Sequence, residues 1–125
     1  GETPVNCASR YGQEDVIRLL HEFGCDMCQP DNKGNTPVLS AAEAGHEGCL
    51  NALHDILMDK ENDEGFTPAY VAAANGHEGV LRLLDIYGCD MRQQSDEDVT
   101  PLEAARTYGH TGCVAILEKG GIALR

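Results

Sequence analysis

The sequence predicts a mainly α-helical solenoid, in which antiparallel helix pairs stack in a row and β-hairpin loops project from them. Thr-Pro recurs four times along the 125 residues, with offsets of 33, 31 and 33 between successive threonines. A glycine follows nine residues after each threonine, and Gly-Cys-Asp-Met occurs twice, 64 residues apart. Such a period indicates a stacked array, because one unit of roughly 33 residues cannot bury its own apolar face.

The first helix of each unit is expected to begin at Thr-Pro, with Thr as the N-terminal cap and Pro in the first turn. Ala-rich segments follow, whose small side chains allow close contact between neighbouring helices: "VLSAAEA", "AYVAAAN" and "LEAARTY". The recurrent glycine then ends the helix in a left-handed conformation. These glycines are Gly12, Gly45, Gly76 and Gly109.

The second helix carries apolar residues at helical spacing, as in "VIRLL" at 16–20. Gly24 and Gly88 end it, and polar stretches such as "QPDNKGN" have the composition of hairpin turns. Asp98 stands where the last hairpin would carry glycine, and Asp tolerates a left-handed backbone. The second unit is two residues short and its "LMDKENDEG" lacks the Gly-Cys-Asp stop, so we expect a local irregularity there.

We expect a single domain of four units, of which the first and last are abbreviated. Units 1 to 4 are approximately residues 1–30, 31–61, 62–94 and 95–125.

Composition limits the partners. Twenty-one acidic against nine basic side chains leave a formal net charge of -12, which would repel phosphate backbones and anionic lipids. We therefore expect neither nucleic-acid binding nor direct membrane contact. No apolar run approaches the roughly 20 residues that span a bilayer, and the first residues do not resemble a signal peptide. A cytoplasmic or otherwise intracellular, monomeric domain is expected, although a longer parent chain could carry its own targeting signal.

The chain resembles the ankyrin repeat family over essentially its whole length. The resemblance rests on the paired "GCDM" and on three segments: "GNTPVLSAAEAGHEGCL", "GFTPAYVAAANGHEGVLRLL" and "TPLEAARTYGHTGCVAIL". The family usually has His two residues after the Pro of Thr-Pro and uses it to hydrogen-bond backbone at the repeat boundary. Because this chain has other residues there, some cross-repeat bonding should be lost; they are Asn6, Leu39, Tyr70 and Glu103.

The resemblance implies a protein-protein interaction module, with contacts made by hairpin tips and the exposed side of the first helices. Among the implied contacts, the aromatic Tyr11, Phe66 and Tyr108 are the expected anchors, because aromatic residues are enriched in binding hot spots. The full implied set is Arg10, Tyr11, Asn32, Lys33, Asn35, Glu43, Asp63, Glu64, Phe66, Asn75, Asp96, Glu97, Val99, Thr107 and Tyr108.

Charge on the hairpins suggests what the partner is. The runs "DKENDE" at 59–64 and "SDED" at 95–98 place acidic residues on adjacent hairpins. A concave acidic surface would favour a basic peptide or a basic protein patch, bound more weakly as salt rises. An equally favoured alternative is that these acidic residues only keep the domain soluble.

The stretch "GHEGCLNALH" at 45–54 has the residue types of a metal site but not the geometry. Cys49 and His54 lie five residues apart, about 140° around a helix, and cannot converge on one metal. Cys49 occupies the same position in its unit as Val16 and Val80 in theirs, so we expect it in the core. His54 should point toward solvent. We expect no metal and no cofactor.

Cysteine chemistry supplies an alternative function, a metal-binding or thiol-redox protein using Cys25 and Cys28, which form a lone CxxC. The competing interpretation makes Cys25 and Cys89 small core residues and leaves Cys28 as an exposed thiol. Cysteines in buried Ala and Val columns offer no disulfide framework, which favours a reducing compartment. No catalytic motif is present, so the chain is not expected to be an enzyme. Another alternative is a regulatory scaffold segment of a larger multidomain protein.

Overall fold

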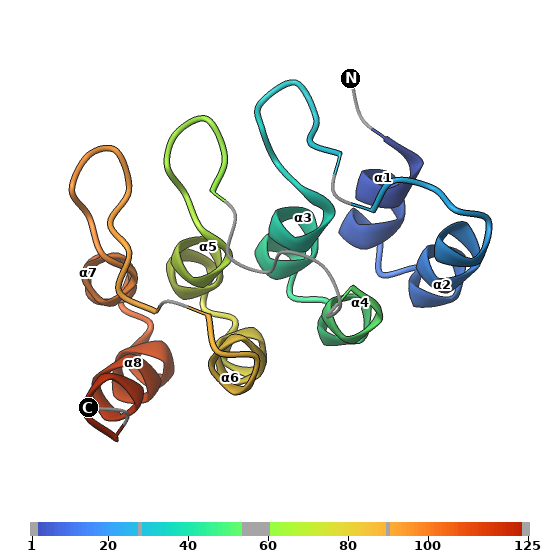
Figure 1. Cartoon of the computed structure of the whole chain (residues 1–125). Helices are drawn as coiled ribbons and strands as arrows, with labels where there is room; N and C mark the ends of the chain where they lie inside the picture. Colours follow the sequence, from blue (N-terminus) through green and yellow to red (C-terminus); the bar gives the residue numbers. More distant parts are fainter. Residues whose placement is uncertain (1–2, 28, 54–60, 90, 124–125) are drawn as a thin grey trace.

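A computed structural model shows four helix pairs side by side in one row (Figure 1). It describes residues 3–27, 29–53, 61–89 and 91–123, with side chains up to Glu118 in the last helix. The first helices of the units form one layer: α1 (Pro4–Arg10), α3 (Pro37–Ala44), α5 (Pro68–Asn75) and α7 (Pro101–Thr107). The second helices form the other: α2 (Glu14–Glu22), α4 (Glu47–Ala52), α6 (Glu78–Ile86) and α8 (Thr111–Ala123).

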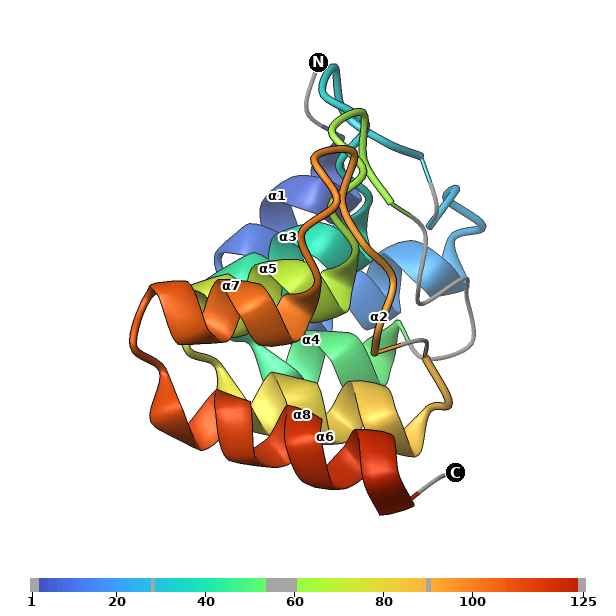
Figure 2. The same cartoon turned by 90° about the vertical axis from the view of Figure 1, so that its left-hand side faces the viewer.

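The loops between units project from the same edge of the first-helix layer, as Figure 2 shows. They turn back on themselves as predicted, but no strand is assigned in the described ranges. The hairpin of unit 2 is closed by short-range bonds: the Gly34 and Asp31 amides donate to the carbonyls of Asp31 and Asn35, both at 3.0 Å. The predicted β-hairpins are therefore tight turns rather than extended ladders.

Every first helix begins as predicted. The Thr hydroxyl oxygen accepts a bond from the amide three residues later in α1, α3, α5 and α7, at 3.1–3.2 Å. The recurrent glycines follow with φ between 74° and 81°, in the left-handed region. Asp98 also has positive φ, at 65°, which confirms that it takes the glycine position of its hairpin.

The core runs through the whole row and is made of small and aliphatic side chains. Helices contact their counterparts in the adjacent unit, α1 with α3, α3 with α5 and α5 with α7, and the second helices do the same. The closest first-helix packing uses alanines that are completely buried. These are Ala41, Ala42, Ala72, Ala73 and Ala105.

A histidine connects each unit to the one before it. In units 2 to 4, the His after the recurrent glycine directs its Nε2 to a carbonyl at the end of the preceding first helix. The bonds join His46 to Arg10 at 3.0 Å, His77 to Glu43 at 2.8 Å and His110 to Ala74 at 3.1 Å. Donation to a carbonyl requires the proton on Nε2.

The glycine before each of these bonds is required for two reasons. Gly45 has φ of 81°, and a Cβ built on it would lie 2.7 Å from Nδ1 of His77. A side chain at Gly45 would therefore be strained in its backbone and would displace the histidine of the next unit. The Gly45-His46 pair, which joins α3 to α4, therefore also takes part in the contacts between units: His46 bonds unit 1 and Gly45 lies against His77 of unit 3.

The expected loss of cross-repeat bonding is wrong at unit 1. Asn6 is buried and its Nδ2 donates to the Asn35 carbonyl at 3.0 Å. The Ser40 hydroxyl donates to Asn6 Oδ1 at 3.3 Å. Asn6 therefore bonds unit 2 in place of the family's histidine, because an amide supplies both a donor and an acceptor. At the same position in unit 4, Glu103 completes a capping box with Thr100.

Two of the sequence-based expectations fall outside the described residues. They are the irregular end of the second helix in unit 2 and the outward orientation of His54, which concern residues 54–60.

The histidine contacts predict a measurable share of the stability. Replacing His77 by Ala should lower the free energy of unfolding by about 1–2 kcal/mol, because the Glu43 carbonyl loses its donor and the packing over Gly45 is lost. His21→Ala is the matched control, since His21 is exposed on α2. Urea denaturation measures both variants, and an equal effect of the two would contradict this role of His77.

Candidate protein-binding groove

One polar side chain shapes each hairpin. Asp31, Asn62 and Ser95 occupy the same position in units 2 to 4, and each accepts bonds from the amides two and four residues later. The distances are 2.8 and 3.0 Å for Asp31, 2.9 and 3.0 Å for Asn62, and 3.3 and 3.4 Å for Ser95. Short side chains with an acceptor oxygen close to the backbone favour this geometry. The tips of all three hairpins are consequently held in one conformation.

Adjacent hairpins are also bonded to each other. The Asp63 amide donates to the Lys33 carbonyl at 3.1 Å, and the Asp96 amide donates to the Glu64 carbonyl at 3.2 Å. The Asn62 amide group donates to Asn35 Oδ1 at 2.8 Å. These bonds fix the spacing of the tips, so the surface that they form is preorganised.

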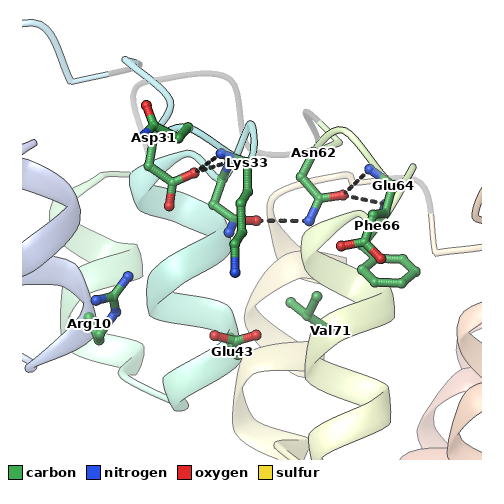
Figure 3. Close-up of a pocket in the computed structure, with 10 residues that line it drawn as sticks. Arg10, Asp31, Lys33, Glu43, Asn62, Glu64, Phe66 and Val71 are labelled. Atoms are coloured by element: carbon green, nitrogen blue, oxygen red, sulfur yellow. Dashed lines mark hydrogen bonds between the residues drawn. The ribbon is translucent and has the colours of Figure 1, made fainter. Parts of the chain in front are cut away.

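A groove of about 430 Å³ lies at the base of these hairpins, between the first helices of units 1 to 3. Figure 3 shows Arg10 and Glu43 on its floor and Lys33 reaching down from the hairpin of unit 2. The side chains that line it are Arg10, Asp31, Asn32, Lys33, Asn35, Glu43, Asn62, Glu64, Phe66 and Val71. Most of these are contact residues that the sequence predicted.

Charge in the groove is mixed rather than uniformly acidic. Partial burial acts to raise the pKa of Asp31, but bonds from the Asn35 and Lys33 amides and the positive Arg10 outweigh it, so the pKa is lowered. Asp31 is therefore ionised and faces two cationic side chains in the same groove. Toward unit 4 the hairpin tips are acidic, because the Lys33 position holds Glu64 in unit 3 and Glu97 in unit 4.

An aromatic pair lies beside the acidic tips. The rings of Phe66 and Tyr70 are stacked, with centroids 4.6 Å apart and planes inclined by 5°. Burial raises the pKa of Tyr70, and Tyr108, Glu97 and Glu64 raise it further because their negative charge disfavours the phenolate. The carboxylates of Glu64 and Glu97 thus act on the environment of the Phe66–Tyr70 pair. Carboxylates and aromatic faces both attract cationic side chains.

The remaining predicted contact residues have varied surroundings. Tyr11 and Tyr108 are 65% and 62% exposed at the ends of α1 and α7. Glu97 is exposed and Val99 half-buried. Asn75 and Thr107 are exposed but bond carbonyls of their own helices, at 2.8 and 2.9 Å.

Asp63 and Asp96 are also exposed, but both lie against the hairpin of the preceding unit. A Cβ built on Gly34 would meet the Asp63 side chain and amide nitrogen, and one on Gly65 would meet those of Asp96. Each aspartate therefore has a role in hairpin stacking besides any contact with a partner.

The sequence does not predict four residues of the groove and the aromatic pair as contacts. They are Asp31, Asn62 and Val71 in the groove and Tyr70 in the pair. The sequence marks Asp31 only as part of a polar turn, and Tyr70 only as a substitute for the family's histidine. The signal in the sequence for Asp31 and Asn62 was their equivalent position, five residues before the Thr of Thr-Pro in each unit. Tyr70 comes four residues after Phe66, but the cap at Thr67 lies between them, so helical spacing alone would not have paired the two rings.

The structure corrects the prediction that Cys25 is a core residue. Cys25 is exposed and its counterpart Cys89 is half-buried, because Cys89 has a unit on either side and Cys25 lies in unit 1. The buried residue of the Gly-Cys-Asp-Met motif is the methionine, Met27 or Met91. Cys7 is exposed as well, although the residues at its position in units 2 to 4 are buried; they are Ser40, Val71 and Ala104.

Other cysteine expectations are confirmed or lie beyond the structure. Cys49 and Cys113 are buried as predicted. Cys28, the second half of the CxxC, lies outside the described residues. In the part of the chain that is described, no group of three or more His, Cys, Asp and Glu side chains is arranged to bind a metal ion.

Comparison with known proteins decides the family. The family model described as ankyrin repeats in three copies matches residues 1–56, and the single ankyrin repeat model matches residues 64–96. The chain belongs to the ankyrin repeat family. Its stacked helix pairs, Thr caps and Gly-His contacts agree with this membership. Ankyrin repeats form protein-protein interaction modules and are generally not enzymes.

Relatives match the chain over less than half of its length. Human ARF GTPase-activating protein GIT1 is 41% identical over 46 residues, which are 37% of this chain and 6% of that protein. Neurogenic locus notch homolog protein 1 of Xenopus tropicalis is 38% identical over 53 residues, 42% of this chain and 2% of that protein. Human ankyrin repeat domain-containing protein 63 is 38% identical over 53 residues, 42% of this chain and 14% of that protein.

The ankyrin chain therefore spans between 2% and 14% of the length of these relatives. Among the helices that the structure describes, none is long and apolar enough to cross a bilayer.

The buried thiol of Cys49 predicts a specific pH dependence of stability. Burial, with a smaller contribution from Glu14, raises the pKa of Cys49 from 9.0 to about 11. Between these values the unfolded chain has lost the thiol proton and the folded chain keeps it, so stability falls as pH rises. The loss should be about 2 kcal/mol between pH 9 and 11.

Cys49→Val is the matched control, because Val80 occupies the same buried position in unit 3. Urea denaturation of both proteins at several alkaline pH values isolates the Cys49 contribution, since the tyrosines titrate in both. Identical alkaline losses in the two proteins would show that the Cys49 thiol is not protected by burial.

Proposed function

We propose that this ankyrin domain binds a basic segment of a partner protein along the hairpin tips of units 3 and 4. The observation that carries the proposal is the arrangement of Glu64 and Glu97 around the stacked rings of Phe66 and Tyr70. A lysine or arginine side chain placed there would meet carboxylates and an aromatic face together. The groove at units 1 to 3 would receive the neighbouring part of the same segment.

Preorganisation supports this assignment over a purely solubilising role for the acids. The tips that carry Glu64 and Glu97 are fixed by bonds that Asn62 Oδ1 and Ser95 Oγ accept from the tip amides, and by the backbone bond between their hairpins. A partner would not have to order these loops, which reduces the entropic cost of binding. Acids needed only for solubility would not require fixed positions.

The mixed charge of the groove gives the bound segment a direction. Arg10 and Lys33 lie at the end toward unit 1, and Glu64 and Glu97 lie toward unit 4. The basic residues of the partner should therefore face units 3 and 4, with polar or acidic residues toward units 1 and 2. Tyr11 and Tyr108 are exposed near the two ends of the surface.

Selection of short random peptides displayed on phage, with the 125-residue chain as bait, tests this function. Lysine and arginine should be enriched, and binding should weaken as salt rises. Replacing Glu64 or Glu97 by Lys should raise the Kd of the selected peptides by about tenfold, because attraction becomes repulsion. Fluorescence anisotropy with the labelled peptides measures the change.

Lys33→Glu is the matched control, because Lys33 occupies the same hairpin position in unit 2. It should leave the affinity for basic peptides unchanged or improve it. Truncating Tyr11, Phe66 and Tyr108 to Ala, one at a time, would identify the aromatic anchors. Binding that ignores salt and both charge reversals would refute the basic-partner assignment.

A further inference from the structure

The stacked rings of Phe66 and Tyr70 form a flat apolar surface at the unit 3 end of the groove. Their planes are inclined by only 5°. Phe66 lines the groove and Tyr70 does not, so Phe66 is the ring of the pair that faces the groove. Both side chains are half-buried, which leaves part of the pair exposed to a ligand.

Glu64 lies at the same end of the groove, and Figure 3 shows it there together with Phe66. Its amide donates to Asn62 Oδ1 at 2.9 Å, and its carbonyl accepts a bond from the Asp96 amide at 3.2 Å. The backbone of Glu64 is therefore fixed on both sides of its Cα atom. In the part of the chain that is described, neither Glu64 nor Glu97 forms an ion pair, so both charges are available to a ligand.

Glu97 contributes to the same surroundings from the next hairpin. It does not belong to the residues that line the groove, but it acts on Tyr70, whose pKa is raised first by burial and then by Tyr108, Glu97 and Glu64. Glu64 is therefore the carboxylate that reaches both the groove and the aromatic pair. Glu97 supplies negative charge near the pair without lining the groove.

Arginine and lysine would use this arrangement differently. The guanidinium group of arginine is planar, stacks on aromatic faces and donates two parallel hydrogen bonds to one carboxylate. The ammonium group of lysine is a compact, strongly hydrated point charge, which is attracted by the carboxylates but has no plane to stack. A flat ring beside a carboxylate with a fixed backbone therefore favours the planar cation.

We propose that this site selects arginine over lysine in the bound segment, with the guanidinium stacked on Phe66 and bonded to the Glu64 carboxylate. Glu97 attracts either cation through its charge alone. The inference rests on the proposed function, because it specifies which basic side chain the same surface recognises. It assigns the selectivity to Phe66 and Glu64, and only general attraction to Glu97.

Matched peptides test the selectivity. The tightest basic peptides from the phage selection are synthesised with each basic position in turn as arginine or as lysine, and their Kd for the 125-residue chain is measured by fluorescence anisotropy. At one position, lysine should raise the Kd by about tenfold relative to arginine, because both the stacking and the paired hydrogen bonds are lost. At the other basic positions the two residues should bind alike.

Variants of the rings use residues that the chain already has at the same positions. Phe66→Val removes the flat ring, and Val99 occupies this position in unit 4. Tyr70→Leu removes the ring on which Phe66 stacks, and Leu39 occupies this position in unit 2. Each variant should reduce the preference for arginine to about twofold or less while lysine peptides keep their affinity. Urea denaturation checks that both variants are folded.

Variants of the carboxylates separate the paired hydrogen bonds from general attraction. Glu64→Gln should weaken the arginine peptide more than the lysine peptide, because only arginine donates two parallel bonds to this carboxylate. Glu97→Gln is the matched control, since Glu97 occupies the same hairpin position in unit 4. It should weaken both peptides by the same factor.

Two results would overturn the arginine preference and leave the basic-partner function intact. The first is equal affinity of arginine and lysine at every position, in peptides whose binding still weakens as salt rises. The second is a preference for arginine that persists unchanged when Phe66 is replaced by Val and when Tyr70 is replaced by Leu. Failure of the 125-residue chain to bind any basic peptide would overturn both the preference and the proposed function.

Discussion

The packing of each helix pair against the pair before it is the interaction on which the rest of this structure depends. No single unit encloses its own apolar side chains, and the completely buried alanines of α3, α5 and α7 lie where neighbouring helices meet. The histidine bonds add a fixed polar contact at every boundary. Stability is consequently a property of the boundaries between units, as expected for a solenoid.

The binding surface follows from this packing. Because the units stack at a constant spacing, equivalent residues of successive hairpins fall side by side, and backbone bonds between Lys33 and Asp63 and between Glu64 and Asp96 hold them there. The scaffold positions repeat, whereas the tip residues change from Lys33 to Glu64 to Glu97. Recognition can therefore vary along the row without any change in the fold.

Much of the fold could be predicted from the sequence, because the Thr caps and left-handed glycines are local features. The exposure of Cys25 was predicted wrongly because burial in a solenoid depends on the neighbouring unit as well as on the motif. The bond from Asn6 to Asn35 was missed for the same reason, since it joins two units. Most residues that line the groove could be predicted from the family pattern. The stacking of Tyr70 on Phe66 could not, because it depends on how the helix and the hairpin before it are arranged in space.

Residue-by-residue amide hydrogen exchange under native conditions tests the central claim that stability lies in the boundaries between units. The account predicts that amides of α3 and α5, which have a unit on either side, exchange slowest and with similar opening free energies. Those of α1 and α2 should exchange faster, because the outer face of unit 1 is exposed. Equal protection of α2 and α6, or independent opening of each unit with its own free energy, would contradict the account.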